Sequence, residues 1–517
     1  MLFYTKALME QDKARKSRRI AKNTLMLYIR MAFLLLVGFY TSRVVLDSLG
    51  ENDYGIYSVV GGVVAMFTII SGALNSAVSR FITFEMGKGE EAQLNKVFST
   101  SVTIQMILSL LVVLITEPVG IWFIRNEMTI APERIPSAIW VLQFSLISFV
   151  VNLMSVPQMA SITAHEKMSA YAYIGILDGL LRLGVALLIL HSPIDRLVWY
   201  SALMAAAVMI VRMAYGLYCR RHFPECRYRP VFDRGLVKEM FSFAGWNFIG
   251  VTSGVLRDQG GNILVNVFFG TAMNAARGVA VQLNGAVQGF VTNFMTAVNP
   301  QITKSYASGD RDYMLSLVRK SSKMSFFLLF LIALPMLFNT EYLLEIWLKD
   351  VPAQSAAFVR LFLIFALSES LSSPLITAQL ATGNIRNYQI VVGGLQLLNI
   401  PVAYFLLRSG APAESTVAVS IVISQICLVA RLMLLKRMVG ISPKDFLLKV
   451  YLRVLAVSAA AVAVPLMVKD MMPDGFAGFC LSVGICVLSA VGAILFVGCS
   501  RSERREIVLM IFNKREG

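Results

Sequence analysis

Charged residues are scarce in this chain. They make up 15% of its 517 residues, whereas a typical soluble domain has about a quarter. Hydrophobic residues make up 57%, and the mean hydropathy is +0.68. This composition excludes an ordinary soluble domain and indicates an all-α polytopic membrane protein.

Motifs for nucleotide hydrolysis and metal chemistry are also missing. The sequence contains neither G-x-x-x-x-G-K-[ST] nor H-E-x-x-H, and it has only three histidines. Its six cysteines lack metal-ligand spacing and lie mostly within or beside apolar runs. Asp310-Arg311-Asp312 has the acid-x-acid form of nucleotide-sugar transferases, but it stands in a short loop without an α/β domain. We therefore predict a non-enzyme without catalytic residues, metal or cofactor. Any transport by this chain would have to be driven by a Na⁺ or H⁺ gradient, by the membrane potential or by the substrate's own gradient.

Long apolar runs dominate what is present. Fourteen of them have the roughly 20 residues that a helix needs to cross a ~30 Å hydrocarbon core. The predicted spans are 23–46, 55–80, 97–124, 136–163, 168–191, 197–219, 240–269, 273–302, 322–340, 355–381, 388–408, 414–436, 446–468 and 475–498.

The net charge of +16 is concentrated between these spans. Basic clusters lie at 6–22, 220–234 and 501–515, and they alternate with loops that carry little charge. This alternation follows the positive-inside rule, so it does not indicate nucleic-acid binding. It predicts a multi-pass membrane protein with both termini in the cytoplasm.

The longest internal loop divides the predicted spans into groups. The predicted domains are a basic cytoplasmic arm (1–22), an N-terminal six-helix bundle (23–219), a cytoplasmic linker (220–239), a C-terminal six-helix bundle (240–436), two extra transmembrane helices (437–498) and a basic cytoplasmic tail (499–517).

An internal repeat supports this division. The segment 76–83 resembles 296–303 at an offset of 220 residues, which also places Gly50 on Gly270 and Gly89 on Gly309. A second set repeats at 217 residues: Ser155, Pro157, Ala164 and Tyr171 fall on Ser372, Pro374, Ala381 and Tyr388. Duplicated halves are common in membrane transporters, although chance matches in a chain rich in Val, Ala and Ser are the alternative.

One predicted helix, 274–299, carries a polar stripe. Arg277, Asn284, Gln288 and Asn299 fall within about 60° of one another at ~100° per residue. Lipid cannot satisfy these groups, so the stripe should face protein or a water-filled cavity.

Other spans carry similar polar residues. Arg30 lies about two turns into the first span, either facing a cavity or extending to the headgroups. Asn75 lies in the second span, and Asn247 and Arg257 lie in the seventh. We predict that these residues line a substrate cavity.

Acidic residues within spans are candidates for ion coupling. Glu369 lies mid-span, where it must be protonated, paired with an arginine or bound to a coupling ion. Asp258 is the second candidate. Asp178 and Arg182, at i and i+4, should pair with each other.

Four further arginines lie near span ends. We predict that they extend to the headgroups. They are Arg212, Arg360, Arg431 and Arg453.

Four segments resemble the polysaccharide-exporter branch of the multidrug/oligosaccharidyl-lipid/polysaccharide (MOP) superfamily, which includes O-antigen flippases. They are 40–46, 243–247, 274–278 and 297–301. The resemblance implies a MATE-like fold of two pseudo-symmetric six-helix bundles in a V, with spans 1, 2, 7 and 8 lining the central cavity. It also implies cavity arginines for a diphosphate, two C-terminal spans that hold a lipid tail, and a location in the cytoplasmic (inner) membrane of a bacterium.

The leading hypothesis is therefore a flippase for a polyprenyl-diphosphate-linked oligosaccharide of lipopolysaccharide, capsule or exopolysaccharide synthesis. Its partners would be membrane lipids, a polysaccharide polymerase and other assembly proteins. A Na⁺- or H⁺-coupled exporter of the MATE type is the first alternative, although its cavity should be richer in acids. A membrane glycan polymerase or ligase is the second, but it would need a large outer loop.

Overall fold

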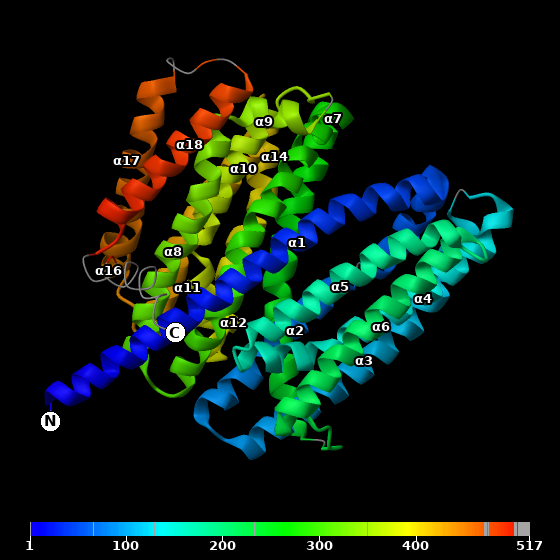
Figure 1. Cartoon of the computed structure of the whole chain (residues 1–517), viewed down its shortest axis with the longest axis horizontal. Helices are drawn as coiled ribbons and strands as arrows, with labels where there is room; N and C mark the ends of the chain where they lie inside the picture. Colours follow the sequence, from blue (N-terminus) through cyan, green and yellow to red (C-terminus); the bar gives the residue numbers. More distant parts are fainter. Residues whose placement is uncertain are drawn as a thin grey trace. The chain divides into compact units, whose positions relative to one another are not determined.

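The computed structural model describes residues 2–65, 67–128, 130–231, 233–348, 350–469, 473, 475–500 and 504. Within these ranges the regular structure is entirely helical, and no strand is present (Figure 1). Twelve described helical segments are long and apolar enough to cross a membrane. The predicted all-helical membrane fold is therefore confirmed.

The chain forms two compact units. The N-terminal unit is Asn23–Val251, and the C-terminal unit comprises Met1–Lys22 and Thr252–Gly517. The division falls inside a long helix, after the predicted linker 220–239, and the predicted domain bounds stay a prediction. The predicted basic tail, 499–517, lies almost wholly outside the described residues.

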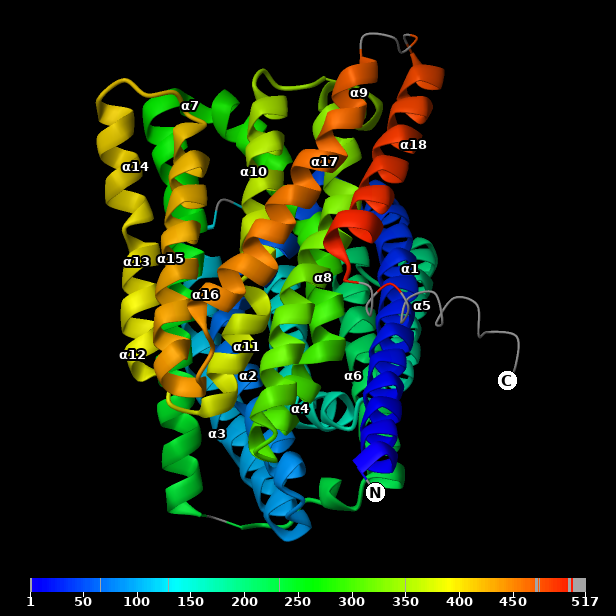
Figure 2. The same cartoon turned by 90° about the vertical axis from the view of Figure 1, so that its left-hand side faces the viewer.

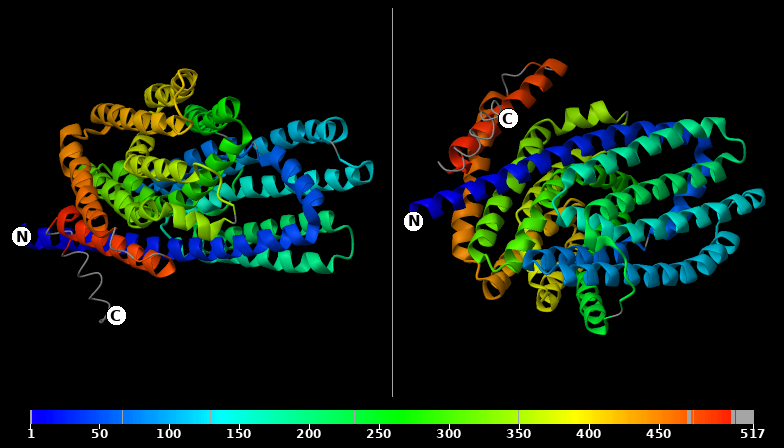
Figure 3. Two further views of the ribbon diagram at one scale, coloured as in Figure 1. Left: turned by 90° about the horizontal axis from the view of Figure 1, so that it is seen from above. Right: turned by 60° about the horizontal axis from the view of Figure 1, so that its bottom comes forward.

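Helices α3 to α6 of the N-terminal unit run alongside one another, cyan to green in the right-hand view of Figure 3. Apolar residues of α4 spaced three or four apart, such as Ala138, Val141 and Leu142, form a buried stripe in their core. The elements are α1 (Leu2–Ala65), α2 (Thr68–Lys88), α3 (Glu91–Asn126), η1 (Pro132–Arg134), α4 (Ile135–Ala164), α5 (Met168–Leu188), η2 (Ile189–His191), α6 (Arg196–His222) and η3 (Pro224–Cys226).

The C-terminal unit holds most of α7 and the helices after it. Several of its predicted spans are broken into stacked pieces, as Figure 2 shows for α12, α13 and α14. The elements are α7 (Arg234–Ala307), α8 (Arg311–Phe338), α9 (Thr340–Trp347), α10 (Ser355–Ser370), α11 (Ser373–Thr382), α12 (Arg386–Tyr388), η4 (Gln389–Gly393), α13 (Gly394–Leu397), α14 (Asn399–Arg408), α15 (Ser415–Val439), α16 (Pro443–Phe446), η5 (Leu447–Tyr451), α17 (Leu452–Val468), α18 (Phe476–Ala493) and η7 (Ile494–Gly498).

The backbone repeats where the sequence does. Gly50 bends α1 with φ 76° and ψ 168°, and Gly270 bends α7 with φ 81° and ψ −173°. This region is open essentially only to glycine. Gly89 and Gly309 also share a left-handed φ, 80° and 79°. At the second offset, Glu166 and Gly383 both have positive φ, 57° and 76°. Three matched pairs of backbone conformations favour duplicated halves over chance matches.

The number of spans differs from the predicted fourteen. The bent helix α7 counts once among the twelve candidates, although it covers two predicted spans. The second predicted span, 55–80, crosses the end of α1 and the start of α2 and is not among the twelve. A count of fourteen is therefore not confirmed.

The segment after α6 makes hydrogen bonds and a stacking contact with α3 and with the α4–α5 turn. His165 lies 2.5 Å from Glu225 and stacks on Phe223 with 4.0 Å between ring centroids. Asn95 donates to the carbonyls of Glu225 and Arg227 at 2.8 and 2.9 Å. Burial raises the pKa of Glu225, but hydrogen bonds from His165 and the backbone outweigh it, so the net pKa is lowered.

Candidate functional site

Arg30 of α1 lies against α5 within the N-terminal unit. Its guanidinium carbon is 4.7 Å from the centroid of the Tyr171 ring. One turn further along α5, a Cβ added to Gly175 would lie 1.9 Å from the Arg30 Nε. The glycine therefore makes room for the side chain, which packs against α5; that Arg30 lines a substrate cavity stays a prediction.

Arg277 has comparable surroundings within the C-terminal unit. It is only 5% exposed, and it donates to Asn262 Oδ1 at 3.3 Å and to the Asp258 carbonyl at 3.2 Å. Its guanidinium carbon is 5.4 Å from the centroid of the Phe362 ring. A Cβ added to Gly261 would lie 2.8 Å from its Nη2.

The two arginines share an electrostatic property. In each, the buried Nε has no hydrogen-bond partner. Among the described residues, neither guanidinium has a carboxylate within 4.0 Å. An aromatic face attracts a cation but carries no formal negative charge. Arg30 and Arg277 therefore keep a positive charge that is not directly paired with a carboxylate, which is suited to an anionic ligand.

A second group of contacts follows one face of α10. Phe362, Phe365 and Glu369 are three and four residues apart, so they share that face. Arg257 lies over Phe365, with 4.9 Å to the ring centroid, and it binds its neighbour Asp258 at 2.8 and 3.2 Å.

Glu369 lies 3.8 Å from Arg431, whose side chain is 2% exposed. Arg431 also donates from Nε to the Tyr388 hydroxyl at 2.9 Å. Of the three states expected for Glu369, the structure supports pairing with an arginine. The prediction that Arg431 extends to the headgroups is wrong, because the side chain is held inside the bundle by Tyr388 and Glu369. The predicted Asp178–Arg182 pair is confirmed at 3.0 Å.

Polar contacts continue from α10 towards η5. Ser368 is hydrogen-bonded to Ser424 and accepts from Gln425, and both partners belong to α15. Tyr451 of η5 in turn donates to Gln425 Oε1 at 2.9 Å. The additional C-terminal helices are thus linked by hydrogen bonds to the helix that carries Glu369.

The predicted amides are spread over both units. In the N-terminal unit Asn75 is exposed, while buried Asn247 donates to the Ala73 carbonyl at 3.4 Å. In the C-terminal unit Asn299 accepts from Thr377 at 2.7 Å, and Gln288 is half-buried. The Oδ1 of Asn284 is buried without a hydrogen-bond partner, so it remains able to accept from a ligand.

Sequence reasoning missed the groups that hold the arginines. They are Tyr171, Gly175, Gly261, Phe362 and Phe365. Aromatic and glycine residues are common throughout apolar spans, so their pairing with a distant arginine leaves no local signal. The described residues contain no cluster of three or more His, Cys, Asp or Glu side chains that could hold a metal ion.

The helical architecture defines a polytopic membrane fold. It is similar to a crystal structure of MATE in complex with MaD3S, with a TM-score of 0.71, 12% identity and coverage of 82% of this chain and 97% of that one. It is also similar to a MOP superfamily transporter from Pyrococcus furiosus, with a TM-score of 0.70, 11% identity and coverage of 81% and 96%. At these identities the likeness shows the fold alone.

The family follows from the sequence itself. The model of the family described as "Polysaccharide biosynthesis protein" matches residues 20–306, more than half of the chain, so the chain belongs to that family. It is also 20% identical over 302 residues to the "Uncharacterized membrane protein EpsK" of Bacillus subtilis (strain 168). That match covers 58% of this chain and 59% of EpsK.

Proposed function

We propose that this protein is a flippase for a polyprenyl-diphosphate-linked oligosaccharide, such as an O-antigen, capsule or exopolysaccharide repeat unit. It moves the molecule from the inner to the outer leaflet by alternating access. The observation that carries this proposal is the positive charge of Arg30 and Arg277, each packed against a glycine and an aromatic ring and, among the described residues, without a carboxylate within 4.0 Å. Membership of the polysaccharide biosynthesis family supports the substrate class.

The physical basis is the interaction of guanidinium with phosphate. A guanidinium can bind two phosphate oxygens through parallel N–H bonds, which an ammonium cannot reproduce. At 4 Å and an effective dielectric constant near 20, one charge pair contributes about 4 kcal/mol. The amides of Asn284, Gln288 and Asn75 would hydrogen-bond the sugars, while the lipid tail stays in the bilayer. The additional helices α17 and α18 would hold that tail.

Substitution of the two arginines tests the proposal. Arg30→Ala and Arg277→Ala should abolish export at normal protein abundance, and lysine at either position should restore only part of it. Arg360→Ala is the matched control, because this arginine is 42% exposed and paired with Glu341. The assay is complementation of a flippase-deficient strain, scored by surface glycan and membrane protein level. Normal export by both alanine variants would refute the anion-binding role.

A Na⁺- or H⁺-coupled exporter of the MATE type is the second candidate. The shared fold and the acids Asp258 and Glu369 favour it. Both acids already contact an arginine, so a coupling ion would have to compete with Arg257 or Arg431. Drug resistance conferred on a sensitive host, without restored surface glycan in the flippase-deficient strain, would select this function.

The proposed setting is the cytoplasmic membrane of a bacterium with both termini inside. A polysaccharide polymerase and other assembly proteins would act on the product. Reporter fusions at Arg15, Arg229 and Arg505 should all give cytoplasmic signals, and an external signal at any of them would contradict this topology.

A further inference from the structure

A cavity of about 890 Å³ lies at one end of the N-terminal unit. This volume falls within the roughly 300–1,000 Å³ that is typical of small-molecule sites. The segments that form it are the bend of α1 and the connection between α3 and α4, which the charge pattern places outside the cytoplasm. The polar and aromatic residues that line it are Asn52, Asp53, Phe123, Glu127, Glu133 and Arg134.

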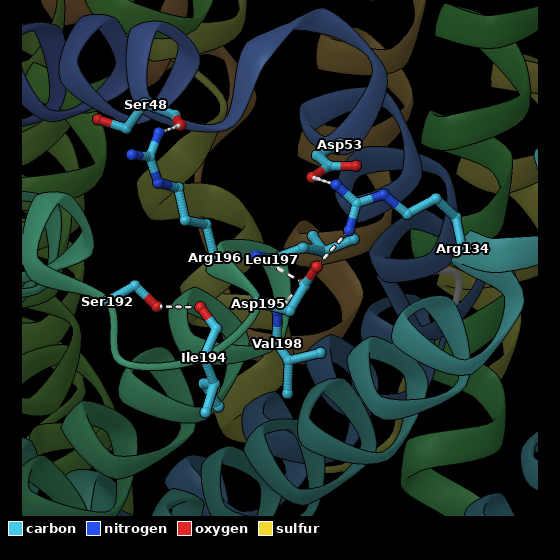
Figure 4. A network of polar contacts seen from close by, with 9 residues as sticks. All are labelled: Ser48, Asp53, Arg134, Ser192, Ile194, Asp195, Arg196, Leu197 and Val198. Carbon is cyan, nitrogen blue, oxygen red and sulfur yellow. Dashed lines mark hydrogen bonds and ion pairs between the residues drawn. The ribbon is translucent and has the colours of Figure 1, made fainter.

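One wall of the cavity is held by charged contacts between three segments (Figure 4). Arg134 donates from Nη2 to Asp53 at 2.8 Å and from Nη1 to Asp195. Asp195 also caps α6 by accepting from the backbone of Leu197 and Val198 at 3.1 and 3.2 Å. These contacts fasten the connection before α4 to the second part of α1 and to the start of α6. The wall is therefore preorganised for binding.

Two acidic side chains line the cavity without a protein partner in the described part of the chain. Within the described ranges, the exposed side chains of Glu127 and Glu133 have no hydrogen-bond or ion-pair partner. Asn52 adds an amide, and Phe123 adds an aromatic ring. With Asp53 already neutralised by Arg134, the two free carboxylates make the cavity acidic.

This chemistry suits uncharged sugars. Ligand sites combine apolar and aromatic surface with a few hydrogen-bonding groups, and sugar hydroxyls can donate to free carboxylates. An anionic group would be repelled by Glu127 and Glu133. Arg30 has the opposite preference, and the twenty residues of helix between it and Gly50 correspond to a rise of about 30 Å.

We propose that this acidic cavity is a subsite for the uncharged sugars of the glycan, separate from the arginines that attract the diphosphate. The inference rests on the proposed flippase function, because it assigns the other end of the same substrate. The sugar chain would bind here at the end of the unit where it emerges, which gives the transporter a preference for neutral over acidic repeat units.

Binding of lipid-free sugars to the full-length protein tests the subsite apart from transport. Isothermal titration calorimetry in lipid nanodiscs would compare neutral chitotetraose with anionic tetragalacturonate. Chitotetraose should bind at least tenfold more tightly. Asn52→Ala and Glu127→Gln should each raise the Kd for chitotetraose by about fivefold or more. Asp47→Asn is the control and should leave this Kd unchanged, because Asp47 is exposed and lies in α1, like Asn52, but does not line the cavity.

A charge-reversed variant keeps the test decisive. The double substitution Glu127→Lys and Glu133→Lys changes exposed side chains, and it should shift the preference towards tetragalacturonate. No chitotetraose binding at millimolar concentration, or the same Kd in all variants, would overturn the subsite. Complementation by the wild-type chain would then still support the flippase. Chitotetraose binding without complementation would instead leave the subsite in place and count against the flippase function.

Discussion

Gly175→Ala should displace the Arg30 guanidinium without removing its charge. The added Cβ would lie 1.9 Å from the Arg30 Nε, whereas ordinary van der Waals contact begins at 3.4 Å. The Nε must therefore move by about 1.5 Å. It would leave its place beside Tyr171, where the guanidinium carbon is 4.7 Å from the ring centroid.

The size of the effect follows from this displacement. At an effective dielectric constant near 20, a charge pair that lengthens from about 4 to about 5.5 Å loses about 1 kcal/mol, or roughly fivefold in affinity. Loss of a charge-assisted hydrogen bond to the phosphate would add about 1.5–3 kcal/mol. We therefore expect transport by Gly175→Ala to fall by about fivefold to several hundredfold, depending on whether the bidentate contact survives.

Gly184→Ala is the matched control on the same helix. A Cβ at Gly184 has no neighbour within 4 Å, so the substitution shares the gain in helix propensity but displaces nothing. Both variants would be assayed by complementation, with protein abundance and thermal stability measured in parallel. If Gly175→Ala exports like Gly184→Ala while Arg30→Ala fails, the position of the guanidinium is irrelevant and the reasoning is refuted.

Three further outcomes concern the fold and the acids. Gly270→Ala should destabilise the protein by about 1–3 kcal/mol, and because the added Cβ has no neighbour within 4 Å, the cause would be backbone strain at positive φ. Gly278→Ala in the same helix should be neutral or stabilising. Equal melting temperatures of the two variants would exclude the strain. The lowered pKa of Glu225 means that its contribution to stability is present above about pH 4.3 and is lost as pH falls through the folded-state pKa. Glu225→Gln should therefore lower the free energy of unfolding by about 1–3 kcal/mol at pH 7, and the melting temperature of the variant should fall less steeply in acid than that of the wild type. The same dependence of the melting temperature on pH in both proteins would contradict this. Glu369→Gln should destabilise the protein by about 3–5 kcal/mol by leaving Arg431 buried without its acid, as chemical denaturation would report. Wild-type stability together with lost Na⁺ or H⁺ dependence would instead indicate ion coupling at Glu369.

Much of the fold could be predicted from the sequence, because lipid imposes a simple rule. A spanning segment must satisfy its own backbone hydrogen bonds, so long apolar runs become helices whatever their neighbours. The repeat was visible for a similarly local reason. Gly50 and Gly270 have backbone conformations that other residues avoid, so the residue type itself marks the position. The number of spans was less secure, since two of the predicted spans are separated only by a non-helical bend at Gly270.

The candidate site could likewise be predicted only in part. Arg30 and Arg277 could be selected from the sequence because a charge within an apolar run is costly wherever it lies. What surrounds each charge depended on tertiary structure. Glu369 and Arg431 looked like a lone acid and a headgroup-facing arginine, yet the packing of α10 against α15 brings them within 3.8 Å. Whether a buried charge is neutralised is decided by partners far away in the chain, and only the packed helices bring those partners together.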